Sequence, residues 1–437
     1  MAVALFNARS PLAAPVDSPT TSPRSAAGTA DKSGTATRRE LPWRVIALNA
    51  TAIWAVTRVA YIGFTYFAIL FSSGSRQLTG QSISPDQLLN TWVHWDGHWY
   101  IRIATQGYYD VQSAAFFPLY PLLIHIVTLG LGQSHIVAAA LLVSNLGALG
   151  AFIGIALLAA NEERGVEASW RTLRMLVAYP LALFLVAPYT EGIFLAFVVA
   201  ALFCARRGSW RWAALWGLLA GLTRPTALAL VLPFLWEYGR QHDWWQRVTW
   251  STGKWRERLD RATLGEGILV VGAVPAAIIL YVLYCSIHLG HPLAIINAER
   301  LYWGHRYMPF GQSLFLGIAN FFMTPAFSDK QAELLVNLAP PVIVIVLTLS
   351  AIRRMPFAFT LYTGGIVYLS LASPVVSPGV PDILTSVGRY LVVAAPIFLL
   401  LGSWTERRPW LEMLLTSGGF LIQAILALVF LRNGLVN

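Results

Sequence analysis

Apolar runs separated by polar and aromatic segments are the most regular feature of the chain. The clearest runs are residues 43–71, 135–160, 267–289, 334–352 and 411–431. About twenty apolar residues in an α-helix are enough to cross the hydrocarbon core of a bilayer. The pattern therefore predicts an all-α, polytopic membrane protein.

Shorter apolar runs lie between these spans. Residues 116–132 contain two prolines and are short for a crossing, so an interfacial or re-entrant helix is favoured. We expect two short spans at 173–188 and 190–205, and two further spans at 356–372 and 388–404.

The apolar run from residue 212 to 238 is interrupted by Thr223-Arg224-Pro225. An arginine that faces lipid in mid-membrane costs about 3 kcal/mol or more, and the proline that follows it breaks a helix. We therefore expect two short helices that form a hairpin with Arg224 at its tip. Counted with this hairpin, the bundle has about 11 transmembrane helices, and residues 72–115 form a long first outer loop.

Composition agrees with a membrane protein, since 56% of the residues are hydrophobic and only 12% are charged. The formal net charge is +10. With the N-terminus inside, most Lys and Arg fall on the cytoplasmic side, as the positive-inside rule describes, so nucleic acid is not an expected partner. Residues 1–40, rich in Ala, Ser, Thr and Pro, are expected to form a disordered cytoplasmic tail. Residues 41–437 then form one transmembrane domain.

One polar and aromatic stretch, Thr91-Trp92-Val93-His94-Trp95-Asp96-Gly97-His98-Trp99-Tyr100, carries a single acid between strongly apolar runs. The carboxylate of Asp96 is a candidate general base that takes a proton from an attacking hydroxyl. Neighbouring aromatic faces, such as those of Trp95 and Tyr100, suit the apolar face of a sugar ring. The alternative is an interfacial aromatic belt with an incidental acid.

His94 and His98 alternate with Asp96, which is the spacing of a metal-ligand set on an extended strand. No cysteine or further acid cluster accompanies them: Cys204 and Cys285 lie in apolar runs and indicate neither a disulfide nor a metal site. We therefore expect no metal, and expect the histidines to donate to a phosphate or a sugar.

Other polar residues fall on the same outer face. Glu191, which follows Tyr189-Thr190, could bind sugar hydroxyls or assist Asp96; alternatively, Thr190 caps a helix and Glu191 complements its dipole. Arg224 and Arg389, the latter beside Tyr390, could hold a phosphate through two hydrogen bonds each. The alternative is that each arginine extends to lipid headgroups.

A further outer segment contains Asn297-Ala298-Glu299-Arg300 and Trp303-Gly304-His305-Arg306, which could form an acceptor groove or an amphipathic interfacial helix. The chain has no P-loop, no dinucleotide-binding glycine pattern, no nucleophile elbow and no Asp-x-Asp pair. A nucleotide or nucleotide-sugar site is therefore not indicated.

The motifs resemble those of a known family. Trp95-Asp96-Gly97-His98-Trp99-Tyr100, followed by Ile103-Ala104 and Gly107-Tyr108, is similar to the first-loop signature of the PIG-V family, the second mannosyltransferases of GPI-anchor assembly, and of their bacterial relatives. Phe116-Phe117-Pro118-Leu119-Tyr120-Pro121 resembles the element that follows it. Matches at Tyr189-Thr190-Glu191, Thr223-Arg224-Pro225, Trp303-Gly304 and Arg389-Tyr390 keep the family's order, over roughly residues 45 to 430.

This resemblance implies a GT-C membrane glycosyltransferase fold. It also implies a polyprenyl-phosphate sugar donor, usually mannose, and a lipid or glycan acceptor at the extracytoplasmic face of the cell membrane, with no cofactor. Asp96 is the catalytic residue by this resemblance. The residues expected to bind substrate are His94, Trp95, His98, Tyr100, Tyr189, Glu191, Arg224, Trp303, His305, Arg389 and Tyr390. Arg224 is followed by Pro-Thr, where eukaryotic relatives carry other small polar residues, and bacteria do not make GPI, so the acceptor is left open.

Two alternatives remain at this point. The same scaffold could transfer another sugar, or the protein could be a non-catalytic, flippase-like transporter of a lipid or glycan. A transporter is expected to show an internal repeat and intramembrane charges along a path. No clear repeat is present in the sequence, and only Arg58 lies deep in a span.

Overall fold

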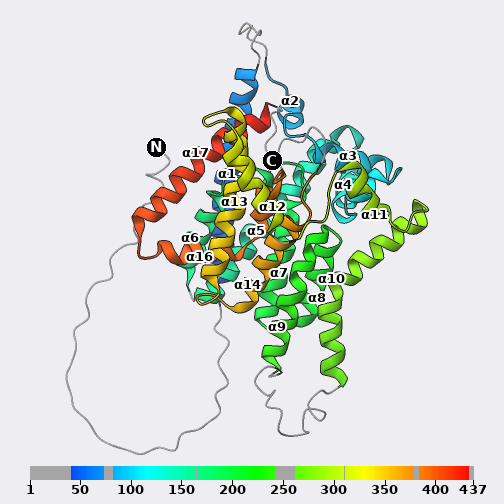
Figure 1. The fold of residues 1–437 in the computed structure, drawn as a ribbon, viewed down its shortest axis with the longest axis vertical. Helices are drawn as coiled ribbons and strands as arrows, with labels where there is room; N and C mark the ends of the chain where they lie inside the picture. The colour runs from blue at the N-terminus through cyan, green and yellow to red at the C-terminus, as the bar shows by residue number, and fades with distance from the viewer. Residues whose placement is uncertain are drawn as a thin grey trace, which may run out of the picture. The chain divides into compact units, whose positions relative to one another are not determined.

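The structure is a computed structural model that describes residues 41–72, 82–163, 165–242, 244, 261–309, 311–376 and 383–432. The chain divides into two units, Met1–Glu40 and Leu41–Asn437, and only the second contains described residues. The predicted cytoplasmic tail therefore lies outside them. The second unit is a bundle of helices (Figure 1). Within the described ranges there is no strand, and the one isolated β-bridge joins His305 and Val375.

The first half of the bundle contains α1 (Trp43–Ser72), α2 (Pro85–Asn90), α3 (Asp96–Gln106), η2 (Gln112–Ala115), α4 (Leu119–Leu131), η3 (Gln133–His135), α5 (Ile136–Glu163), α6 (Val166–Val177), η4 (Ala182–Leu185) and α7 (Glu191–Arg206). The second half contains α8 (Trp210–Gly221), η5 (Pro225–Leu230), α9 (Val231–Gln241), α10 (Arg261–His288), α11 (Ala294–Asn297), η6 (Ala298–Tyr302), α12 (Gln312–Met323), α13 (Asp329–Ala351), α14 (Phe357–Ala372), α15 (Val387–Tyr390), η7 (Leu391–Val393), α16 (Pro396–Thr405) and α17 (Pro409–Leu431). The η elements are 3₁₀-helices, except η6, which is one turn of π-helix.

Five of the described helical segments are long and apolar enough to cross a membrane. They are Trp43–Leu70, Gln133–Glu163, Thr263–His288, Asp329–Ala351 and Pro409–Leu431. A sixth results if Val387–Val393 and Pro396–Thr405, which are bent by 76° at their break, are taken as one span. The all-α, multi-pass class is therefore confirmed, whereas the expected number of about 11 crossings is not.

Two expected segments differ from the prediction. The run 173–188 is not a span, because α6 ends at Val177 and the chain continues through turns and the short η4 to Thr190. Pro180 and Pro188 explain this, since a proline breaks the hydrogen-bond ladder of a helix interior. The first outer loop is not a loop throughout, since it contains α2, α3 and η2.

The hairpin around Arg224 is present. Trp210 at the start of α8 packs on Tyr238 near the end of α9, with ring centroids 4.9 Å apart. Gln241 at the end of α9 donates through Nε2 to the carbonyl oxygen of Ala205, 2.8 Å away. The two helices are therefore antiparallel, and Arg224 lies in the turn between them.

The irregular chain between α6 and α7 is buried, so its carbonyl groups need partners from neighbouring helices. Arg58 of α1 donates through Nη2 to Leu185 O at 2.9 Å and through Nε to the Asn145 side chain at 2.8 Å. Asn145 in turn donates to Val186 O at 3.1 Å. Arg58, which lies deep in the first span, thus donates a hydrogen bond to a backbone carbonyl group of the irregular segment.

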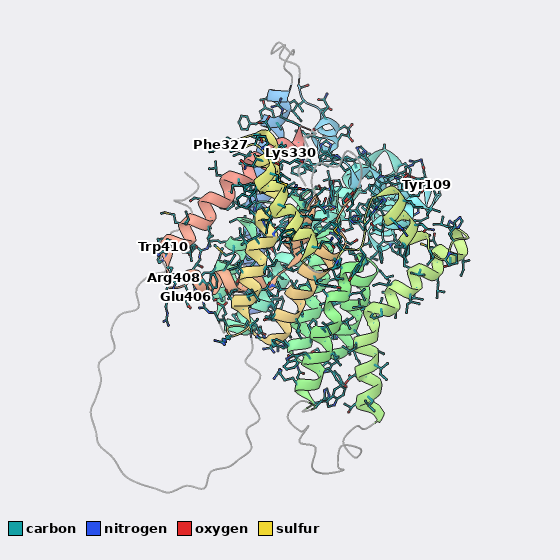
Figure 2. The ribbon with its side chains drawn as sticks, viewed as in Figure 1. Tyr109, Phe327, Lys330, Glu406, Arg408 and Trp410 are labelled. Atoms are coloured by element: carbon teal, nitrogen blue, oxygen red, sulfur yellow. The ribbon has the colours of Figure 1, made fainter. Side chains whose placement is uncertain are left out.

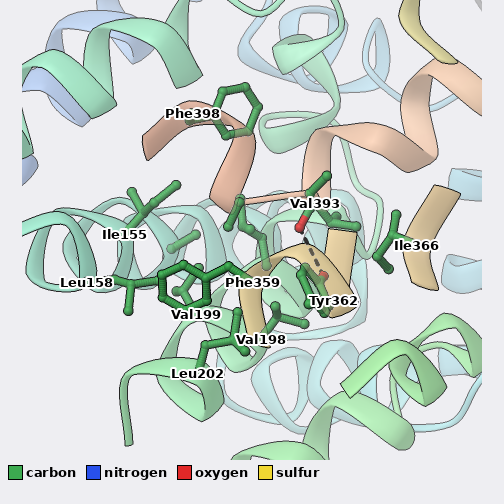
Figure 3. Close-up of a cluster of buried hydrophobic side chains, with 14 of the residues drawn as sticks. Ile155, Leu158, Val198, Val199, Leu202, Phe359, Tyr362, Ile366, Val393 and Phe398 are labelled. Carbon is green, nitrogen blue, oxygen red and sulfur yellow. Dashed lines mark hydrogen bonds between the residues drawn. The ribbon is translucent and has the colours of Figure 1, made fainter. Parts of the chain in front are cut away.

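A second irregular segment links α15 to α16 and is held in the same way. Tyr179 donates to Gly388 O at 2.6 Å, and Tyr362 of α14 donates to Val393 O at 3.0 Å. Figure 3 shows the second bond beside a core in which side chains of α5, α7, α14 and α16 meet. The two breaks in the helical ladder therefore become fixed parts of the fold.

The helices α5 and α7 approach each other closely at glycines. A Cβ atom on Gly147 would lie 2.6 Å from the backbone Cα of Ile193, and one on Gly192 would lie 2.8 Å from Ser144 O. Small residues allow such close approach between membrane helices, whose association rests on packing. Because Gly192 follows Glu191, this contact also sets the position of the start of α7.

We predict that Gly147→Ala destabilises the protein by about 1–3 kcal/mol, because the added methyl group meets backbone that must move. The measurement is thermal unfolding of the purified protein in detergent. Gly63→Ala is the matched control: Gly63 lies in α1 with no atom within 4 Å of its Cβ position. It should leave stability equal or slightly increased. Equal stability of the two variants would contradict the close α5–α7 contact.

Candidate active site

Asp96 is the first residue of α3, and the backbone just before it is unusual. Trp95 has φ 39° and ψ −109°, outside the regions that residues with a side chain favour. Ser386, which precedes α15 and Arg389, has φ 66°. These are two of the three non-glycine residues with positive φ in the described ranges. Such backbone strain concentrates at functional sites, where surrounding contacts hold it in place.

Two carboxylates and two guanidinium groups from four separate segments form an alternating row, which we call the charge row. Arg224 Nη1 donates to Glu191 Oε1 at 2.8 Å. The same Glu191 oxygen lies 3.3 Å from Arg389 Nε, and Arg389 Nη2 lies 2.8 Å from Asp96 Oδ2. The order is Arg224, Glu191, Arg389, Asp96.

Exposure increases along this row from its centre to Asp96. The side chain of Glu191 is 1% exposed and that of Arg389 is 9%, whereas that of Asp96 is 22%. A buried charge is tolerated only when it is paired, and here each carboxylate has at least one guanidinium beside it. Asp96 and Glu191 also occupy the first turns of α3 and α7, where the helix dipole stabilises negative charge.

A cavity of about 760 Å³ opens beside the charge row. Seven of the residues predicted from the sequence line it: Asp96, Tyr100, Arg224, Trp303, His305, Arg389 and Tyr390. They come from segments that are up to three hundred residues apart along the chain. The expected convergence of the lone acid with the two distant arginines is thus present.

Aromatic rings form one part of the cavity wall. Phe116 and Trp303 both line it, and their ring centroids are 5.3 Å apart in an edge-to-face arrangement. Tyr100 packs edge-on against Phe116 at 5.0 Å. The motif that opens with Phe116-Phe117-Pro118 therefore belongs to this wall. A surface of this kind suits the apolar face of a sugar ring.

The other predicted binding residues are not in the lining. Tyr189 and Glu191 lie behind it, where Tyr189 donates to His94 O at 3.0 Å and is 1% exposed. His94 and Trp95 pack against Phe430, with centroids 5.0 and 5.5 Å from its ring. Burial lowers the pKa of His94, so this imidazole is kept neutral more readily than usual.

His98 is exposed on α3. Because this segment is helical from Asp96 onward, the side chains of His94, Asp96 and His98 do not project together as they would from a strand. In the part of the chain that the structure describes, no three His, Cys, Asp or Glu side chains gather as a metal site would require. That the activity needs no metal stays a prediction.

The lining also contains residues to which the sequence gave no firm role. These are Thr223, Glu299, Arg300, Arg306 and Tyr307. Glu299, Arg300 and Arg306 belong to the outer segment for which the sequence predicts either an acceptor groove or an amphipathic interfacial helix. These three residues line the cavity, while Leu301 and Tyr302 of the same segment are exposed; that the segment binds the acceptor stays a prediction. The π-helical turn at 298–302 that presents Glu299 has no signal in the sequence pattern.

A second group of ion pairs marks the opposite end of α7. Arg206, its last residue, binds Glu162 at 2.7 Å and Glu237 at 3.0 Å. Glu191 and Arg206 are the first and last residues of the sixteen-residue α7, which is about 24 Å long. Figure 2 shows Glu406 and Arg408, near the start of α17, well away from Tyr109, which follows α3. The charge row and the ion pairs of Arg206 are thus at opposite ends of α7.

Comparison with known proteins supports a membrane glycosyltransferase as the class of protein. Residues 42–238 match the model of the mannosyltransferase family PIG-V. The family recognised from the motifs is therefore confirmed over this part of the chain, which includes Asp96, Glu191 and Arg224. Among curated proteins, no sequence matches.

Two solved structures are similar to the chain. The chain is similar to ArnT from Cupriavidus metallidurans bound to undecaprenyl phosphate, with 16% identity, a TM-score of 0.46, and coverage of 84% of this chain and 62% of that one. It is also similar to the oligosaccharyltransferase of Archaeoglobus fulgidus in complex with zinc and sulfate, with 12% identity, a TM-score of 0.38, and coverage of 86% and 54%. The chain thus spans less than two thirds of either protein's length.

We predict that Glu191→Gln lowers stability by about 3–5 kcal/mol, because it leaves two largely buried arginines with one carboxylate between them. The measurement is thermal unfolding in detergent. Glu167→Gln, at an exposed position on α6, is the control and should change stability by less than about 0.5 kcal/mol. A Glu191→Gln protein as stable as the control would mean that the row does not depend on this charge.

Proposed function

We propose that the protein is an inverting mannosyltransferase of the cell membrane, which moves mannose from a polyprenyl-phosphate-mannose donor to a lipid-linked or glycolipid acceptor. The observation that carries the proposal is the convergence of Asp96, Arg224 and Arg389 beside one aromatic-walled cavity. The match to the PIG-V mannosyltransferases supports mannose as the sugar. The absence of a nucleotide motif from the sequence agrees with a lipid-phosphate donor.

Asp96 is the general base of the proposed reaction. Its Oδ2 atom lies beside Arg389, which leaves Oδ1 to accept the proton of an acceptor hydroxyl. The hydroxyl oxygen attacks the anomeric carbon as the bond from that carbon to the phosphate oxygen breaks. The electron pair of the broken bond stays on the phosphate. Because the hydroxyl attacks from the side opposite to the phosphate, the configuration inverts and a β-linked donor gives an α-mannoside.

The departing phosphate gains charge in this step, and cations placed for it stabilise the transition state. Arg224 uses Nη1 for Glu191, so its other donors remain for a phosphate oxygen. The charge row itself is balanced, with two positive and two negative groups. Arg300 and Arg306 are exposed members of the lining and add positive charge to the wall, which favours an anionic donor.

The proposed orientation has the cavity on the extracytoplasmic side and the N-terminus in the cytoplasm. The positive-inside rule supports it, because the most basic loops follow the ends of helices opposite to the charge row. Among them, the segment after Arg206 belongs to the end of α7 far from Glu191. A donor with a long polyprenyl chain can then stay in the outer leaflet while its sugar enters the cavity.

We predict that Asp96→Asn lowers mannose transfer by at least about 100-fold, since general base catalysis contributes roughly 10²–10⁴ in rate. The assay uses purified protein, polyprenyl-phosphate-mannose and a lipid extract from cells that lack the gene, with mass spectrometry of the lipid products. Asp86→Asn changes an exposed acid of the same outer segment and should retain wild-type transfer.

Retained transfer by Asp96→Asn would contradict the proposed base. Movement of a lipid across the bilayer with no gain of a hexose mass would instead favour a transporter. A product carrying a different sugar would keep the reaction class and reject mannose.

A further inference from the structure

Glu299 is a second carboxyl group in the cavity. It lies in the π-helical turn η6 and lines the same cavity as Asp96 and Arg224. Single π-turns are uncommon and occur often at functional sites. Unlike Asp96 and Glu191, Glu299 has no arginine or lysine within 4 Å in the described part of the chain, and its recorded ion-pair partner is His305.

The geometry fixes which nitrogen of His305 faces Glu299. His305 Nδ1 lies 2.7 Å from the carbonyl oxygen of Ser373. A carbonyl only accepts hydrogen bonds, so Nδ1 carries a proton. The other nitrogen, Nε2, lies 3.6 Å from Glu299 Oε2, slightly more than a hydrogen bond. A small rotation lets the carboxyl group and Nε2 share one proton.

The segment that carries this pair is held rigidly. His305 N donates to Glu299 O at 2.8 Å, which ties the two residues together through the backbone. Arg306 N donates to Pro374 O at 3.1 Å, and Val376 N donates to Gly304 O at 2.8 Å. The position of the imidazole beside Glu299 is therefore set by backbone contacts to the chain after α14.

The charged and titratable groups around Glu299 come from several elements. Those that line the same cavity are Asp96 and Tyr100 of α3, Arg224 of the hairpin turn, Arg389 and Tyr390 of α15, and Arg300, His305, Arg306 and Tyr307 of its own segment. Desolvation raises the pKa of Glu299; the charge of Asp96 raises it further, while His305 and Arg224 oppose the shift. Glu299 therefore holds a proton at higher pH than an ordinary glutamate.

We propose that Glu299 and His305 act as one proton-accepting pair, which takes the acceptor's proton on from Asp96 and releases it to water at the cavity mouth. This inference rests on the proposed mannosyl transfer and adds two residues to it. After transfer, Asp96 carries the proton of the former hydroxyl. When that proton moves to the pair, Asp96 regains its charge, and the pair then loses the proton to solvent. No oxidant or second substrate is needed.

Two variants separate proton transfer from structure. Glu299→Gln keeps the shape and removes the acid. His305→Asn keeps an N–H where Nδ1 donates to Ser373 O, but removes Nε2. We expect turnover to fall about 10- to 100-fold in each, with the KM for polyprenyl-phosphate-mannose unchanged and the acid limb of the pH–rate profile altered. His305→Gln, whose amide is not a base near neutral pH, should be as slow as His305→Asn.

Infrared spectroscopy gives a readout that needs no acceptor. A protonated carboxyl C=O band should titrate above the usual range of glutamate in the wild-type protein, disappear in Glu299→Gln and remain in Glu167→Gln. An unchanged spectrum overturns the proposal, as does wild-type turnover with an unchanged pH profile in both variants. If Asp96→Asn is inactive while Glu299→Gln and His305→Asn are normal, the relay is wrong and the proposed function stands. If Asp96→Asn is active, the proposed base itself is wrong.

Discussion

Glu191 is almost fully buried, and two arginines compensate its charge. These arginines belong to different interruptions of the helical bundle, one in the hairpin between α8 and α9 and the other in α15. An uncompensated ion in such surroundings costs several kcal/mol. The three segments are therefore coupled: the hairpin turn and the bent α15–α16 segment both have to reach the start of α7. Asp96, at the exposed end of the row, takes its position from Arg389.

The same segments break the helical ladder, which is costly in an apolar bundle because every freed carbonyl needs a donor. The protein meets this cost with side chains from neighbouring helices and, for Tyr179, from the chain just after α6. Arg58 and Asn145 serve the chain before α7, while Tyr179 and Tyr362 serve the chain around α15. These four polar side chains, which have few polar neighbours in the sequence, thus fix the backbone segments that carry the site residues. Precise placement of charged groups is what electrostatic catalysis requires.

The sequence predicts those parts of the fold that depend on local composition. Apolar runs locate the long spans, and Arg224-Pro225 locates the hairpin because neither residue is tolerated inside a lipid-facing helix. Convergence of Asp96, Arg224 and Arg389 follows from the small number of polar residues between the apolar runs at one end of the bundle. The prediction of a span at 173–188 is wrong because a short buried segment and a short span have the same high hydropathy. The backbone turns in this segment after α6 ends.

Other features depend on contacts between distant residues, and no local pattern contains them. Packing of His94 and Trp95 on Phe430 involves a helix more than three hundred residues away, so their aromatic and polar character alone gave a different expectation. Glu299 illustrates the same limit. In the sequence it is one acid in an amphipathic stretch, and only the π-turn and the pairing of the following loop with residues 374–376 bring it to the cavity.

In the proposed mechanism, the balance of charge in the row explains how the site can be stable by itself and still attract an anionic donor. Two unpaired arginines would bind phosphate strongly but would be costly to bury without a ligand. Glu191 and Asp96 remove that cost, and they also weaken the field that a phosphate would meet at Arg224 and Arg389. The exposed Arg300 and Arg306 restore a positive field at the wall, where water keeps their own desolvation small. In the proposed mechanism the buried pairs therefore fix the geometry of the site, while the exposed arginines attract the donor. This division leaves Asp96 partly exposed to the cavity, as a base must be.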